Sequence, residues 1–135
     1  MDVVDKKYLT WSQVEGLVEE LATQVKSEFT NIDSIYGIPR GGLIPAVMLS
    51  HKLGIPLITK LGYGALTTLI VDDICDSGKT LKLYEGLTTA VLLHKPHTSS
   101  SVPTLFGSVH SSDAWIIYPW ERDDSKTIQD YKLDI

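Results

Sequence analysis

The sequence predicts an α/β protein with a mostly parallel sheet and helices on both faces of that sheet. Short apolar runs rich in β-branched residues alternate with stretches of helical periodicity, and glycine-containing loops follow two of the runs, at residues 39–42 and 71–80. With 135 residues, of which 43% are hydrophobic and 21% charged, the chain has the composition of a globular domain. Residues 1–135 are therefore expected to form a single domain.

The first half of the chain predicts a helix, a strand and a second helix. Residues 10–29 place their apolar side chains on one helical face, and Thr10 with Gln13 suits a capping box. Residues 34–38 are apolar and β-branched, which is typical of a buried strand. After the turn at residues 39–42, a second helix is expected to continue to about Leu53 and to end at Gly54.

The second half of the chain predicts further strands with one helix between them. The expected strands cover residues 55–59, 67–71, 88–93 and 105–109, an apolar segment follows at 114–118, and the helix covers 78–85. Ligands of such folds gather at the carboxyl ends of the strands, where both glycine loops fall.

Composition argues against several classes of protein. No apolar run approaches the roughly 18 residues of a membrane span, and no segment resembles a signal peptide, so a cytoplasmic protein is expected. The lone Cys75 and four scattered histidines lack the paired spacing of a zinc site. A net charge of −5 without a run of Lys or Arg argues against nucleic-acid binding.

Residues 71–80, VDDICDSGKT, join two kinds of chemistry in one loop. Backbone amides and hydroxyls of the Ser-Gly-Lys-Thr half, at the start of a helix, suit a phosphate group. The carboxylates of Asp72, Asp73 and Asp76 would repel a phosphate unless they face a metal ion or sugar hydroxyls. A phosphorylated sugar bound with Mg²⁺ satisfies both halves.

Two other interpretations of this loop are open. A nucleotide P-loop shares the Gly-Lys-Thr ending, but it requires glycine at position 73, where the chain has Asp73. An acidic helix cap would account for single Asp and Ser residues. The concentration of three Asp residues before Ser-Gly-Lys-Thr favours a binding site.

Residues 70–80 resemble the phosphoribosyl-pyrophosphate signature of the type I phosphoribosyltransferases, in which an apolar strand ends in two acids and a third acid precedes Ser/Thr-Gly-x-Thr. The resemblance implies that Asp72 and Asp73 hold the ribose hydroxyls directly or through Mg²⁺. It further implies that the 5-phosphate is wrapped by Asp76, Ser77, Gly78, Lys79 and Thr80. Asp76 would also lie near the base and move its proton.

Residues 36–46 are similar to the pyrophosphate loop of the same family, in which Arg40 and the amide of Gly41 would face the leaving group. The resemblance implies a non-proline cis peptide between Pro39 and Arg40. A simple turn with an exposed arginine is the alternative.

Residues 94–96 and 113–121 look like the base-binding region of xanthine-guanine phosphoribosyltransferases. There Lys95 would donate to the purine 6-oxo group and Trp115 would stack on the ring. The choice among 6-oxopurines would depend on the contact to the purine 2-position, for which a backbone carbonyl near Ile116 or Glu121 is a candidate. The alternatives are a solvated lysine and core tryptophans; for Trp120 we expect packing. Cys75 is expected to be a small packing residue rather than a nucleophile.

The resemblance implies a purine-salvage phosphoribosyltransferase that transfers ribose 5-phosphate from phosphoribosyl pyrophosphate to a 6-oxopurine, with Mg²⁺ and in a homo-oligomer (dimer or tetramer). One departure is the connection between residues 55 and 67, which is too short for the family's long loop; Tyr63 between two glycines is a candidate residual flap. This shortening keeps a second hypothesis open, a non-catalytic domain that senses phosphoribosyl pyrophosphate. A pyrimidine phosphoribosyltransferase is disfavoured by Lys95 and Trp115.

Overall fold

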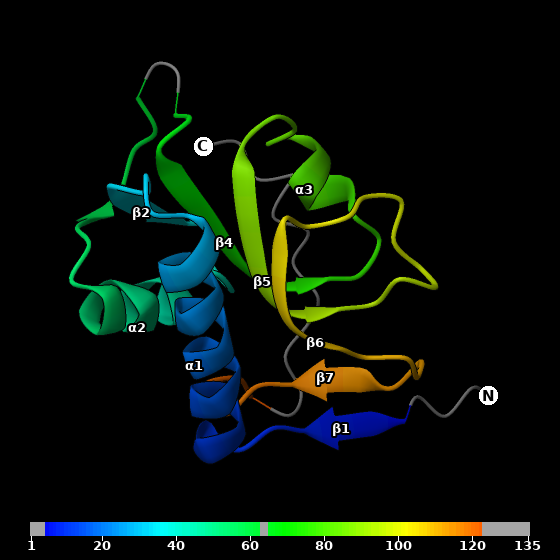
Figure 1. The fold of residues 1–135 in the computed structure, drawn as a ribbon. Coiled ribbons are helices and arrows are strands. Elements are labelled where there is room, and N and C mark those ends of the chain that lie inside the picture. The colour runs from blue at the N-terminus through cyan, green and yellow to red at the C-terminus, as the bar shows by residue number, and fades with distance from the viewer. Residues whose placement is uncertain (1–4, 63–64, 123–135) are drawn as a thin grey trace.

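The computed structural model describes residues 5–62 and 65–122 (Figure 1). Its centre is a five-stranded sheet in the order β3-β2-β4-β5-β6, in which each neighbouring pair is parallel. The strands are β2 (Ser34–Gly37), β3 (Leu57–Ile58), β4 (Thr68–Cys75), β5 (Thr88–His94) and β6 (Leu105–Val109). The predicted parallel α/β fold is confirmed.

The two long helices pack on one face of this sheet, and a short one lies on the other face (Figure 1). Helix α1 (Trp11–Glu28) begins with the predicted capping box, in which the amide of Gln13 donates to Thr10 Oγ1 at 3.1 Å. Helix α2 (Leu43–Leu53) ends as predicted at Gly54, whose φ of 65° is a left-handed conformation that suits glycine.

The core is divided unequally between the two faces. The larger cluster joins α1 and α2 to the sheet through fully buried side chains that include Leu21, Leu49 and Leu92. The smaller cluster lies beneath α3 (Lys79–Lys82), where Leu81 packs against Ile70 and Val91. Most of the apolar burial that stabilises the fold is therefore on the α1/α2 face.

The structure corrects two predicted boundaries near the Asp-rich loop. The helix expected over residues 78–85 spans only Lys79–Lys82, because Gly86 turns the chain at φ 86° and β5 already begins at Thr88. Strand β4 does not end at Val71 but continues to Cys75, because its pairing with β5 extends to Cys75 and His94. Asp72 and Asp73 thus lie within a strand.

A separate two-stranded sheet was not predicted. Strand β1 (Lys6–Tyr8) pairs in parallel with β7 (Trp115–Ile117), with Lys6 opposite Trp115. The three residues of β1 are exposed and carry two lysines, so they give no apolar signal. The expected strand at residues 55–59 is also shorter, at Leu57–Ile58, whereas β6 has its predicted bounds.

Within the described ranges, none of the helices has the length and apolar character needed to cross a membrane. The proposed flap at Tyr63, and the tail after residue 122, lie outside the described residues.

We predict that Gly16→Ala raises the free energy of unfolding by about 0.5–1 kcal/mol, because an interior helical glycine costs more backbone entropy than alanine. Gly16 is exposed within α1, and an added Cβ would meet no atom within 4 Å. Equilibrium unfolding in urea measures the change. Gly54→Ala is the control: its positive φ predicts a loss of stability. An unchanged or lower stability for Gly16→Ala would contradict this account of α1.

Candidate active site

The predicted site residues converge at the carboxyl edge of the sheet, beginning with the loop after β2. Ile38 donates its amide to the carbonyl of Val71 at 2.9 Å, which holds this loop against β4. A Cβ on Gly42 would lie 2.2 Å from that same carbonyl, and one on Gly41 would lie 2.3 Å from Asp73 Oδ2. Both positions therefore require glycine for the loop to approach the acidic strand.

The peptide bond between Pro39 and Arg40 is cis, as predicted. Arg40 is exposed in the turn that leads into α2. The loop thus presents a cation next to Gly41, which itself contacts Asp73.

The two adjacent acids are fixed by backbone amides. Asp72 is 3% exposed, and its Oδ1 accepts the amide of Asp73 at 2.9 Å. Asp73 is half-buried, and its Oδ1 accepts the amide of Ile74 at 2.8 Å. Such bonds favour the charged form of a carboxylate and set its orientation.

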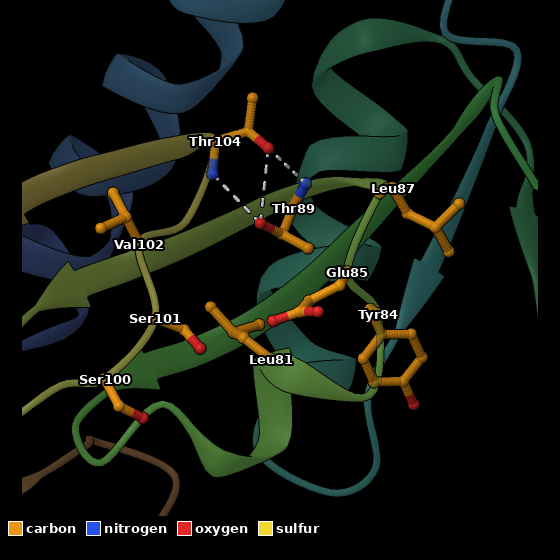
Figure 2. A pocket seen from close by; sticks show the side chains of 10 residues that line it. Leu81, Tyr84, Glu85, Leu87, Thr89, Ser100, Ser101, Val102 and Thr104 are labelled. Carbon is orange, nitrogen blue, oxygen red and sulfur yellow. Dashed lines mark hydrogen bonds between the residues drawn. The ribbon is translucent and has the colours of Figure 1, made fainter.

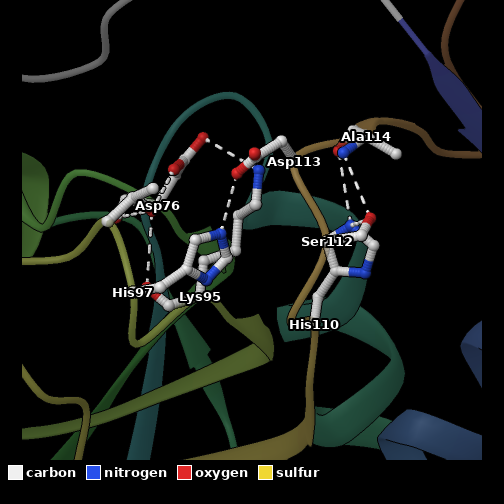
Figure 3. Close-up of polar contacts among 8 residues, drawn as sticks. Asp76, Lys95, His97, His110, Ser112, Asp113 and Ala114 are labelled. Atoms are coloured by element: carbon white, nitrogen blue, oxygen red, sulfur yellow. Dashed lines mark hydrogen bonds and ion pairs between the residues drawn. The ribbon is translucent and has the colours of Figure 1, made fainter.

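The third acid lies beside a buried lysine (Figure 3). Lys95 follows β5, its amide donates to the carbonyl of Cys75 at 2.9 Å, and its Nζ lies 3.7 Å from Asp76 Oδ2. The side chain of Lys95 is 6% exposed and that of Asp76 is 41% exposed. A buried ammonium is stabilised by such a partner. The pair offers a hydrogen-bond donor and an acceptor side by side.

The segment expected to bind a phosphate leads into a shorter helix than predicted. Gly78 precedes α3 with a φ of 84°, and the amide of Lys79 donates to Ser77 Oγ at 3.3 Å. Ser77 and Lys79 are exposed, and Thr80 is half-buried. Since α3 is a single turn, the expected contribution of a helix dipole is small. Binding would depend on the local amides and hydroxyls.

Four consecutive residues between β5 and β6, for which the sequence predicted no role, form a support for this segment. We call residues 98–101 the brace. The paired contacts join Thr98 to Asp76, Ser99 to Cys75, Ser100 to Ser77 and Ser101 to Gly78. The only signal in the sequence was the run of four hydroxyl residues shortly after Lys95.

The segment around Trp115, which was expected to bind the base, is held beside β4 by Tyr118. Its hydroxyl donates to the carbonyl of Asp73 at 2.9 Å, and it is buried. Trp115 in β7 is 37% exposed, so part of its ring is accessible. The side chain of Ile116 is in the main core, which leaves only its backbone for a ligand.

Trp120 and Cys75 have the packing roles that were expected. Trp120 stacks on Tyr118 with 4.7 Å between ring centroids and also contacts Trp11. Cys75 is 1% exposed, and burial raises the pKa of its thiol, with Ser99 as its hydrogen-bond partner. A buried thiol with a raised pKa is a poor nucleophile.

A polar cavity of about 400 Å³ lies between α3 and the brace (Figure 2). Its lining includes Leu81, Tyr84, Ser100 and Thr104, and neither Asp76 nor Lys95 belongs to it. The early end of α3 accounts for this space, because residues 83–87 turn away instead of continuing a helix.

The group of side chains and the parallel sheet define a class of protein: adjacent acids on a central strand, a glycine loop against them and a third acid followed by Ser-Gly-Lys-Thr just after the strand are the arrangement that type I phosphoribosyltransferases share. Comparison with known proteins agrees. The xanthine-guanine phosphoribosyltransferase of Cereibacter sphaeroides is 30% identical, over 84% of this chain and 86% of the relative. The enzyme of the same name from Nitratidesulfovibrio vulgaris is 27% identical, over 85% and 84%.

A solved structure gives the same result. The purine phosphoribosyltransferase of Pyrococcus horikoshii Ot3 superposes with a TM-score of 0.74 at 35% identity, over 93% of this chain and 100% of that chain. A scan against models of protein families gave no match. The chain belongs to the purine phosphoribosyltransferases, which are pentosyltransferases of purine salvage. The predictions of family, fold class and enzymatic function are confirmed, and nothing favours the sensing domain.

We predict that Tyr118→Phe changes how stability depends on pH. Burial raises the pKa of Tyr118 well above its ordinary value of about 10, and the charges of Asp73, Asp72 and Glu121 act in the same direction. Below about pH 10 both the folded and the unfolded protein keep the phenolic proton. Above that pH the unfolded protein loses it first, so stability falls as the pH rises toward the folded pKa.

The variant should lose about 1 kcal/mol of unfolding free energy at pH 7, because the carbonyl of Asp73 loses its donor. Its stability should then decline less steeply than that of the wild type above about pH 10. Urea unfolding at several pH values measures both effects, with Tyr8→Phe as the exposed control. Parallel curves for Tyr118→Phe and the wild type would refute the role of the buried hydroxyl.

Proposed function

We propose that this site transfers ribose 5-phosphate from phosphoribosyl pyrophosphate to a 6-oxopurine (hypoxanthine, guanine or xanthine) and releases pyrophosphate. The observation that carries the proposal is the pairing of Asp76 Oδ2 with Lys95 Nζ at 3.7 Å, directly after the acidic strand. A purine with a ring N–H and a 6-oxo group presents a donor and an acceptor that match this pair. The ammonium of Lys95 can only donate hydrogen bonds, so it would favour the oxo group of a 6-oxopurine over the amino group of adenine.

The reaction forms a bond from a purine nitrogen to carbon 1 of the ribose and breaks the bond from that carbon to the pyrophosphate oxygen. The proton on the attacking nitrogen passes to Asp76, which acts as the general base. The pyrophosphate leaves with the electron pair of the broken bond. Positive charge develops on the ribose ring, so the carboxylates of β4 stabilise the transition state electrostatically.

We assign the other predicted residues to the pyrophosphate, the 5-phosphate and the base. Arg40 and the amide of Gly41 bind the leaving pyrophosphate, next to Asp73. The 5-phosphate binds to Ser77, Gly78, Lys79 and Thr80, whose segment follows Asp76 directly. At the base end, Trp115 stacks on the purine, and the backbone of Ile116 contacts its 2-position.

Asp72 and Asp73 would hold Mg²⁺ together with oxygens of the substrate. The described residues contain no cluster of three or more His, Cys, Asp or Glu that could hold a metal alone. Two neighbouring carboxylates suit Mg²⁺, which takes few protein ligands and keeps water or substrate oxygens. When bound, the ion would neutralise charge on the pyrophosphate. Assembly into a dimer or tetramer stays a prediction, to be measured by light scattering.

The first test is pyrophosphate release from phosphoribosyl pyrophosphate and Mg²⁺, with hypoxanthine, guanine, xanthine, adenine, orotate and uracil added separately. Release that depends on a 6-oxopurine supports the proposal. Release only with adenine or a pyrimidine, or none with any base, would overturn it. A reaction without base measures hydrolysis.

We predict that Asp76→Asn lowers kcat by about 10²–10⁴-fold, the usual contribution of acid–base catalysis. The amide cannot accept the proton of the purine, but it has nearly the same shape as the carboxylate. The KM for phosphoribosyl pyrophosphate should change much less. A steady-state assay gives both constants, and an unchanged kcat would remove Asp76 from the mechanism.

We predict that Lys95→Met lowers kcat/KM for hypoxanthine and guanine by about 10–100-fold, as expected for a lost hydrogen bond to a charged group. The activity with adenine should not fall in proportion. Lys52→Met is the matched control, because Lys52 pairs with Glu19 on the exposed surface of α1. An equal loss with adenine would contradict the proposed contact with the 6-oxo group.

A further inference from the structure

We propose that Thr98 is the positioning residue of Asp76: its hydroxyl holds one carboxylate oxygen and so directs the proton of the purine to the other. This inference rests on the proposed function and adds a residue that neither the motif at residues 70–80 nor the base-binding segment contains. It follows from the geometry of the brace.

The Thr98 hydroxyl lies 2.7 Å from Asp76 Oδ1. Two backbone carbonyl oxygens lie farther from Thr98 Oγ1: the carbonyl of Asp76 at 3.0 Å and the carbonyl of Lys95 at 3.4 Å. A hydroxyl has one proton to donate, and a charged acceptor at the shortest distance is the strongest of the three. The hydroxyl of Thr98 therefore donates to Oδ1 of Asp76.

This bond makes the two oxygens of Asp76 unequal. Oδ1 is held by Thr98, whereas Oδ2 is the oxygen nearest Lys95, at 3.7 Å. When Oδ2 receives a proton, Oδ1 is still a carbonyl oxygen and still accepts from Thr98. The contact with Thr98 thus persists before and after proton transfer, and the carboxyl group keeps its orientation throughout.

The neighbours of Thr98 fix its position relative to Asp76. Ser100 donates its amide and its hydroxyl to the carbonyl of Ser77, at 2.9 and 3.0 Å. On the other side of Thr98, the amide of Lys95 is bound to the carbonyl of Cys75. Because Thr98 stands between two segments that are bonded to residues 75–77, its backbone is held close to Asp76.

Because α3 is a single turn, Asp76 depends on the brace for its orientation. A side chain on a loop needs supporting contacts to be held within about 0.5 Å of a productive geometry. Asp76 is 41% exposed and precedes a helix of only four residues, so little else in its surroundings restricts it. Thr98 provides the restriction through a side-chain contact.

The test compares kcat and both KM values for the wild type, Thr98→Val, Thr98→Ala and Thr98→Ser. Valine keeps the shape of threonine without the hydroxyl, alanine is the second variant without a hydroxyl, and serine restores it. The exposed position of Thr98 allows each variant to fold, which circular dichroism checks. Thr23→Val, on the exposed surface of α1, is the matched control.

We expect Thr98→Val and Thr98→Ala to lower kcat by about 10-fold or more, within the contribution of acid–base catalysis. Both KM values should stay within about threefold of the wild type, since ground-state binding is unchanged. Thr98→Ser should recover most of kcat. In an Asp76→Asn background, Thr98→Val should cause no further loss, because it acts through Asp76.

Three results would overturn the role of Thr98: an unchanged kcat in both variants without the hydroxyl, an equal loss in the Asp76→Asn background, or no recovery with serine. These differ from failure of the proposed function. If the wild type releases no pyrophosphate with any 6-oxopurine, the proposed function fails and the role of Thr98 fails with it. If the wild type is active and the variants match it, only the role of Thr98 fails.

Discussion

The contact between the loop after β2 and the middle of β4 is the constraint on which the site depends. Ile38 is bound to the carbonyl of Val71, and Gly42 approaches that carbonyl so closely that any side chain would collide with it. This approach brings Gly41 onto Asp73 and the exposed Arg40 beside it. The two glycine-containing loops and a pair of acids are thereby concentrated at the carboxyl edge of the sheet, where ligands of such folds bind.

The contacts of the brace compensate for the shortness of α3, which covers the second face of the sheet. In a doubly wound sheet a long helix usually covers such a face, and here one turn does so. The brace at residues 98–101 is bonded instead to residues 75–77, at the end of β4 and just beyond it. Because the amide of Lys95 is bonded to the carbonyl of Cys75 just ahead of the brace, Lys95 and residues 75–77 are held by the same structure.

Local signals in the sequence predicted most of the fold and part of the site. The capping box at Thr10, the end of α2 at Gly54 and the parallel sheet depend on residues close in sequence or on strong apolar runs. The end of α3 was not predicted, because it is set by the start of β5 and not by helix propensity. The brace was also missed, since hydroxyl side chains are typical of loops, and only the fold shows that they contact residues 75–77.

In the proposed site, the residues assigned to the phosphates are exposed and those assigned to the base are more buried. Arg40, Ser77 and Lys79 are exposed, so bound anions would have to displace water there. Lys95 and Tyr118 are buried, and their hydrogen bonds are shielded from solvent. Under the proposed function, the short connection between β3 and β4 would leave the reacting carbon open to water, and a bound purine would have to exclude that water.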